Sequence, residues 1–170
     1  MFRKISWIVM FPAATLSGCA YSSSDTLVSM SDNTASSIFI KEIAVKISAP
    51  DAPAELADVV RSRLRKELKK CATGDRPARL DVTIAVFSGA NPGKKNFAGH
   101  AIVIRGTARI TDTYGIVLGD YDIVESLGAA GVGGAVVLAY GGNTVAASFA
   151  RAVCKLGFDY SAQNLLQSTG

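Results

Sequence analysis

The sequence predicts a single α+β domain with the element order β-α-β-β-β-α, in which two helices cover one face of a mixed sheet. Four segments alternate apolar and polar residues, which is typical of strands with one buried face. Two other segments repeat apolar residues every three or four positions, which is typical of helices packed on a sheet. The first helical segment lies between two strand segments, and this succession favours a crossover between parallel strands.

The first strand and the first helix are predicted between residues 38 and 71. Ile43, Val45 and Ile47 alternate with small or charged residues, so the range 38–48 is predicted to be a half-buried strand. A proline-containing break follows, and we expect the helix to begin after it with Asp51 as its N-cap. The apolar positions of this helix form one stripe: Leu56, Val60, Leu64, Leu68 and Cys71.

Three further strands are predicted from alternating patterns at 79–87, 102–111 and 116–125. The longer stretch 88–96 between the first two of these strands is predicted to be a loop. Asp112 to Gly115 has the composition of a tight turn, which would join the last two strands as a hairpin. The alternation is broken around Gly119, where we expect a bulge or a close backbone contact.

The segment between Glu125 and Arg151 contains no charged residue and is rich in glycine. From Asn143 onward the apolar residues are again spaced as in a helix, which predicts a second amphipathic helix at the end of a domain that spans residues 38–167. Residues 168–170 are expected to fray.

The N-terminal residues have the pattern of a secretory signal. Arg3 and Lys4 precede an apolar run that is too short to cross a bilayer, and small residues end it. The residues Leu16-Ser17-Gly18-Cys19 resemble the lipobox of bacterial lipoproteins. This resemblance implies that residues 1–18 are removed as a signal peptide and that Cys19 receives a diacylglyceryl thioether. Because Ala20 and not aspartate follows Cys19, it also implies anchoring in the outer membrane, facing the periplasm.

Residues 19–37 are predicted to be the lipidated cysteine followed by a flexible tether. The segment is rich in Ser, Thr, Asp and Asn and has only scattered apolar residues. Such a segment buries too little surface to offset its ordering entropy. We therefore expect the folded domain to stand off the membrane surface.

The cysteines and the charge indicate the compartment and exclude one class of partner. Once Cys19 is lipidated, Cys71 and Cys154 are an even pair in an oxidising compartment and are candidates for a disulfide. The alternative is that both are small buried core residues. The formal net charge of +4 falls by two when Arg3 and Lys4 are removed, so no broad basic field indicates nucleic acid.

The first helix carries a cluster of cations that is a candidate binding surface. These residues are expected to bind an acidic protein partner or phosphate-bearing lipid headgroups: Arg61, Arg65, Lys66, Lys69 and Lys70. The alternative is a solvated helix face whose last cations suit the helix dipole. A lipid or glycan ligand is also open, and the oligomeric state is not fixed by the sequence.

No pattern that could indicate an enzyme comes with the other residues that a catalytic site would need. We therefore expect a non-enzymatic protein without catalytic residues, cofactor or metal. The run Gly131 to Val136 has valine where a dinucleotide-binding fingerprint needs its third glycine. Asp120 and Asp122 share one strand face at a spacing that would suit a carboxylate pair, but an outward acidic edge is the simpler interpretation. His100 has no nucleophile motif or metal-ligand spacing near it.

The lipobox and the order of elements resemble several families of small envelope lipoproteins, most of them of unknown function. They are also similar to the lipopolysaccharide-assembly lipoprotein and to the auxiliary lipoproteins of ABC-type envelope transporters. The resemblance implies an accessory in envelope assembly or transport that docks a protein or lipid partner. The strand edge at Ile38–Ile47 is expected to accept a partner strand. The alternative is a glycine-zipper lipoprotein that inserts in the membrane and oligomerises through residues 127–142, where small residues recur four apart, as in Ala129 with Gly133.

Overall fold

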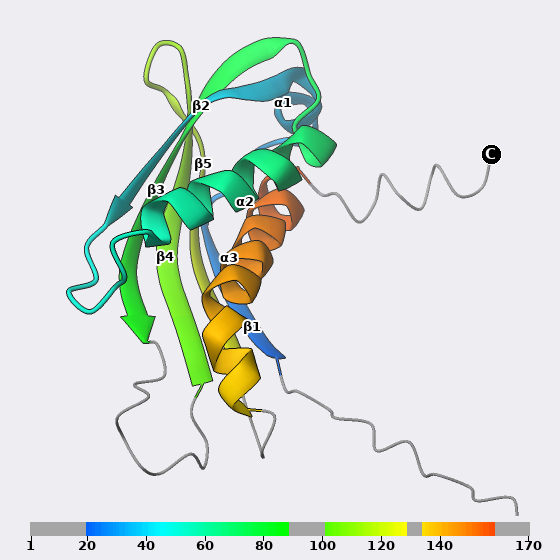
Figure 1. The fold of residues 1–170 in the computed structure, drawn as a ribbon. Coiled ribbons are helices and arrows are strands. Elements are labelled where there is room, and N and C mark those ends of the chain that lie inside the picture. Colours follow the sequence, from blue (N-terminus) through cyan, green and yellow to red (C-terminus); the bar gives the residue numbers. More distant parts are fainter. Residues whose placement is uncertain (1–19, 89–100, 129–133, 159–170) are drawn as a thin grey trace, which may run out of the picture.

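Five strands form one mixed sheet, and α2 and α3 lie across the same face of it in the computed structural model (Figure 1). The structure describes residues 20–88, 101–128 and 134–158. In chain order the elements are β1 (Ala20–Val28), α1 (Asp32–Ser37), β2 (Ile38–Ile47), α2 (Leu56–Cys71), β3 (Arg76–Ser88), β4 (Ala101–Asp112), β5 (Val117–Gly128) and α3 (Gly134–Phe158).

The strands lie side by side in the order β1-β5-β4-β3-β2. β2 and β3 are parallel and are connected through α2, while the other three neighbouring pairs are antiparallel. This arrangement confirms the predicted α+β class and the predicted crossover. It also leaves β2 and β1 as the two edges of the sheet.

The core lies between the inner face of the sheet and the two long helices, as the apolar spacing predicts. Leu80, Val82 and Ile84 of β3 are at most 1% exposed. The stripe of α2 is buried at every position from Leu56 to Cys71 that the spacing selects. Burying one such aliphatic side chain contributes about 1.5–3 kcal/mol, which is why the periodic positions determine how each helix faces the sheet.

The expectation of a tether at 19–37 is wrong for most of that range, because the folded unit begins at Ala20 rather than at Ile38. β1 pairs with β5 in antiparallel register from Ala20 opposite Leu127 to Val28 opposite Asp120. α1 follows, and its first turn is capped by Ser31, whose hydroxyl accepts a hydrogen bond from the Thr34 amide. β1 is stabilised by backbone pairing at an edge that the helices leave uncovered, so its side chains do not show the alternation of a buried strand.

Both long helices begin at residues other than those expected. α2 begins at Leu56, because the chain at 50–55 forms turns and Glu55 rather than Asp51 stands at the N-cap. α3 begins at Gly134, nine residues before Asn143. One of its glycines has a packing role: a Cβ at Gly141 would lie 2.1 Å from Ile102 Cδ1, so the helix approaches β4 closely at this point.

The β4–β5 hairpin and its irregularity agree with the prediction. The Asp112 side chain accepts hydrogen bonds from the Tyr114 and Ile116 amides, and Gly115 takes a positive φ of 83°. The register shifts where Ile110 pairs with Gly119 and Thr111 pairs with Val117, which is the bulge expected near Gly119.

Candidate docking surfaces

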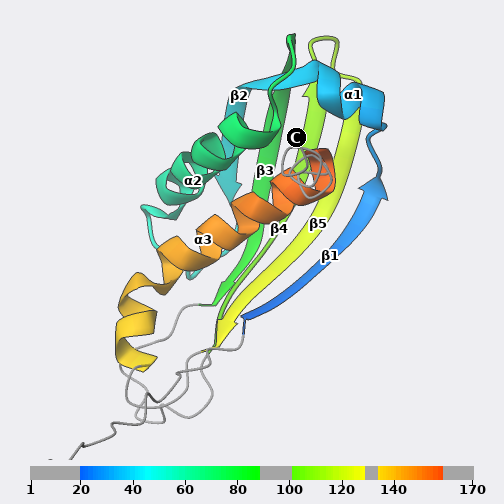
Figure 2. The same cartoon turned by 90° about the vertical axis from the view of Figure 1, so that its right-hand side faces the viewer.

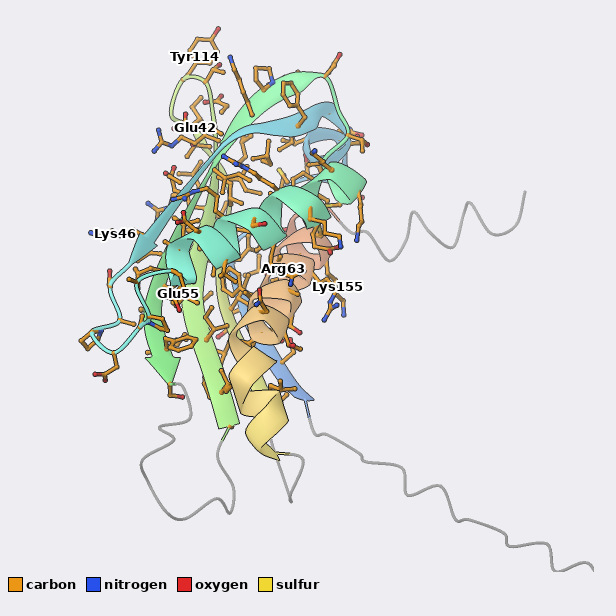
Figure 3. All side chains as sticks on the ribbon, in the orientation of Figure 1. Glu42, Lys46, Glu55, Arg63, Tyr114 and Lys155 are labelled. Carbon is orange, nitrogen blue, oxygen red and sulfur yellow. A yellow bond between two sulfur atoms is a disulfide. The ribbon has the colours of Figure 1, made fainter. Side chains whose placement is uncertain are left out.

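The start of β1 defines one end of the molecule. Ala20 pairs with Leu127, and Ala101 at the start of β4 pairs with Gly128 at the end of β5. These strand ends lie together at the lower end of Figure 1, and the β4–β5 hairpin with Tyr114 lies at the opposite end (Figure 3). Cys19 lies outside the described residues. Lipidation at Cys19 would place the anchor one residue before β1.

β2 is an edge strand, so one of its sides is open to pairing with a strand of another molecule. It pairs with β3 on one side only, so its other side offers unpaired backbone groups. Its register shifts between Ile40 and Glu42, which leaves Lys41 as a bulged, exposed residue. The bulge divides the edge and leaves Ile43–Ile47 as a regular segment next to it.

The predicted cations of α2 lie outside its buried stripe, and all of them except Arg61 are exposed. Arg61 is half-buried and pairs with Asp58, and Lys70 Nζ lies 2.7 Å from Glu67 Oε2. Arg65, Lys66 and Lys69 are exposed, and within the described part of the chain they have no ion pair.

The structure brings the β2 edge and part of the cation cluster together in one place. A groove of about 170 Å³ lies between the strand and the helix, and we call it the β2–α2 groove; it is lined by Phe39, Ile40, Ile43, Arg65, Leu68, Lys69 and Ala72. Two unpaired cations, Arg65 and Lys69, therefore stand beside an apolar floor and an open strand edge. Lys66 and Lys70 do not line this groove.

A second groove, which the sequence does not predict, lies between β1 and α3. We call it the β1–α3 groove; its lining residues are Ser22, Ser24, Glu125, Ser148, Arg151, Ala152, Lys155 and Leu156. Glu125 is only 6% exposed and faces inward on the same side of β5 as Tyr121 and Ile123. In the sequence, Glu125 stands two residues after Ile123 and four after Tyr121, so it falls on the buried face of the strand. This position of a charged residue could have indicated the site.

Cys71 and Cys154 are joined by a disulfide, with a Cα–Cα distance of 5.8 Å. The bond links the last turn of α2 to α3. Both residues are also buried, at 3% and 4% exposure, so the two interpretations of the sequence apply together.

The acidic residues considered for paired-carboxylate chemistry are ion-paired on the open face of the sheet. Asp120 accepts hydrogen bonds from Nε and Nη2 of Arg109 at 3.0 and 2.6 Å. Asp122 accepts one from Arg105 at 2.7 Å, and this hydrogen bond raises the pKa of Arg105 above its ordinary value. The two carboxylates are held by separate arginines and do not form a shared acidic pair. The interpretation as an outward acidic edge is also wrong, because β5 lies between β1 and β4 and Asp120 is only 6% exposed.

Some predicted features lie outside the described residues. His100 and residues 131–133 of the glycine run do so, as do Ala129, Ala130 and Gly133 of the glycine zipper. The zipper therefore stays a prediction. Gly141, which is described, packs against Ile102 within the domain.

Among the described residues there is neither a cluster suited to a metal ion nor a membrane-spanning helix. Within residues 20–88, 101–128 and 134–158, no three His, Cys, Asp or Glu gather closely enough to hold a metal ion. None of the helices in the described part is both long enough and apolar enough to cross a membrane.

Known proteins are similar to this chain in fold. A DUF330 family protein from Xanthomonas campestris is 12% identical, with 83% of this chain and 97% of that one covered, at a TM-score of 0.54. The PelC dodecamer from Paraburkholderia phytofirmans is 9% identical over 78% of this chain and 94% of that one, at a TM-score of 0.44. A minor lipoprotein from Acinetobacter baumannii is 12% identical over 68% and 90%, at a TM-score of 0.42.

No protein-family model matches the chain, and the search of curated proteins found no match. The Xanthomonas structure shows that the α+β arrangement described above is a shared fold.

Proposed function

We propose that this protein is an outer-membrane lipoprotein that faces the periplasm and acts as a non-enzymatic accessory in envelope assembly or transport by docking a protein partner. The signal pattern and the lipobox-like residues that end at Cys19 support the anchor. Acyl chains on Cys19 would hold the protein durably, since each buried CH₂ contributes about 0.8 kcal/mol.

The β2–α2 groove is the observation that carries the docking proposal. An extended segment of a partner could add its backbone to the free edge of β2 and place side chains on the apolar floor at Ile43. Arg65 and Lys69 stand beside this edge without carboxylate partners in the described part of the chain. They favour a partner segment with acidic side chains, because charge complementarity fixes register and speeds association.

The position of β1 supports a domain held close to the membrane. Because β1 begins at Ala20, only one peptide bond separates a lipidated Cys19 from the first strand of the sheet. A domain held this close to the membrane would meet two kinds of partner: proteins at or in the outer membrane, and proteins that extend across the periplasm to the outer membrane.

The experiment is a pull-down of the full-length lipidated protein from cross-linked envelopes. The variant Arg65→Gln/Lys69→Gln removes the two cations of the β2–α2 groove. The matched control Lys66→Gln/Lys70→Gln removes two charges from the same helix outside the groove. We expect a distinct partner to be captured by the wild type and by the control, and to be lost from the groove variant. Equal capture by both variants would contradict the proposal.

A further inference from the structure

The β1–α3 groove is a mixed-charge polar site that docking at β2 does not use. α3 crosses the sheet obliquely, and β1 lies beyond it as an uncovered edge strand (Figure 2). The space between them is about 370 Å³. Ser22 and Ser24 of β1 are exposed in it, although they point to the same side of the sheet as the core.

The floor of the groove carries a buried carboxylate. Glu125 is 6% exposed, and the Ser22 hydroxyl donates a 2.6 Å hydrogen bond to its Oε1. Within the described residues no cation lies within ion-pair distance of it. A buried carboxylate with one hydroxyl donor retains capacity to accept from an ammonium or hydroxyl group, because an ionised carboxylate has about four acceptor sites.

The wall of the groove carries two cations. Arg151 and Lys155 lie one helical turn apart on α3 and are both exposed (Lys155 is labelled in Figure 3). Arg151 donates a 2.9 Å hydrogen bond to the Ser148 hydroxyl. Neither cation has a carboxylate partner in the part of the chain that the structure describes. A guanidinium and an ammonium at this spacing are suited to an anionic group such as a phosphate.

We propose that the β1–α3 groove binds the phosphoethanolamine headgroup of a phospholipid from the membrane that holds Cys19. Arg151 and Lys155 bind the phosphate, and Glu125 accepts from the ammonium group. The charges are complementary: the groove carries one carboxylate and two cations, and the headgroup carries one ammonium group and one phosphate.

The location of the groove favours a lipid as the source of this phosphate. Ser22 is two residues from Ala20, which is about 7 Å along a strand. The polar headgroup region of one leaflet is about 5–8 Å deep. The inference thus rests on the proposed anchoring at Cys19, which brings the Ser22 end of the groove near the headgroups. Lys155 lies farther from the anchored end, where it also lines a pocket with Ser29 and Met30.

The first test measures headgroup binding in solution with the full chain carrying Cys19→Ala, so that its outcome is independent of anchoring. Calorimetric titration with glycerophosphoethanolamine should show saturable binding. Arg151→Gln/Lys155→Gln should weaken that binding at least tenfold, while Lys66→Gln/Lys70→Gln leaves it unchanged. Glu125→Gln, which keeps an acceptor for Ser22, should weaken glycerophosphoethanolamine but not glycerol 3-phosphate, which lacks the amine.

The second test identifies the source. Native mass spectrometry of the lipidated protein released from mixed phosphatidylethanolamine–phosphatidylcholine bilayers should show one retained phosphatidylethanolamine, with occupancy reduced at least tenfold in Arg151→Gln/Lys155→Gln. Equal affinity for inorganic phosphate and for glycerophosphoethanolamine would make the ligand a free anion and overturn the proposal, as would an absence of saturable binding. Partner capture that persists under either result leaves the docking function standing, because it depends on Arg65 and Lys69.

Discussion

Loss of the Cys71–Cys154 disulfide should lower the stability of the protein by several kcal/mol. The two cysteines are 83 residues apart in the chain, and the bond closes a loop of that size in the unfolded state. The chain-entropy relation gives about 4.5 kcal/mol for such a loop at 25 °C. Because domains of this size are stable by only about 5–15 kcal/mol, the bond accounts for a large part of the total.

The assay is urea unfolding of the oxidised and the reduced protein. With a denaturant slope of about 2 kcal/mol/M, reduction should lower the midpoint by about 2 M. The control is Cys71→Ala/Cys154→Ala, whose midpoint should be low and should not respond to dithiothreitol. A midpoint that is the same with and without reductant in the wild-type protein would refute the reasoning.

Three other predictions follow from particular contacts. Burial raises the pKa of Tyr121, and the Met30 backbone near its hydroxyl only partly offsets this shift; the unfolded chain therefore ionises first above about pH 10, and stability falls as the pH rises further. Tyr121→Phe should reduce this alkaline loss, measured as the urea midpoint between pH 8 and 10.5. Gly141→Ala should destabilise by about 1–3 kcal/mol in thermal unfolding, because its Cβ would meet Ile102, whereas Gly142→Ala, with nothing within 4 Å, should stabilise by up to about 1 kcal/mol. Amides of β1 that pair with β5 should be protected in hydrogen exchange. Unprotected exchange throughout β1 would contradict the strand and support the interpretation of this segment as a flexible tether.

The periodic parts of the fold could be predicted from the sequence, because burial acts on side chains at fixed spacing. The stripe from Leu56 to Cys71 and the alternation around Val82 correspond to positions that are buried in the structure. The class of fold and the β2–α2–β3 crossover followed from these patterns.

β1 could not be predicted in this way, because it is held by backbone pairing with β5 and leaves both side-chain faces largely exposed. Serine-rich composition then indicates a tether and not a strand. The start of α3 was missed for a related reason: glycine has low helix propensity, and packing of Gly141 against Ile102 overrides it.

The candidate sites depend on contacts between elements that are distant in the chain. The cations of α2 and the β2 edge were each predicted, but their meeting in one groove follows from how α2 packs beside β2. The β1–α3 groove needed a strand that the sequence did not reveal, although Glu125 in phase with Tyr121 and Ile123 was a usable signal.

The central claim is that the β2 edge docks a foreign protein; the alternative is that the glycine-rich run makes homo-oligomers. A photo-reactive amino acid at Lys46, which is exposed on β2 (Figure 3), and one at Gly142, which faces open space, test both in living cells. We expect an adduct with a different protein from position 46 and none from position 142. An adduct with a second copy of this chain from position 142, with none from position 46, would contradict the claim and favour the glycine zipper.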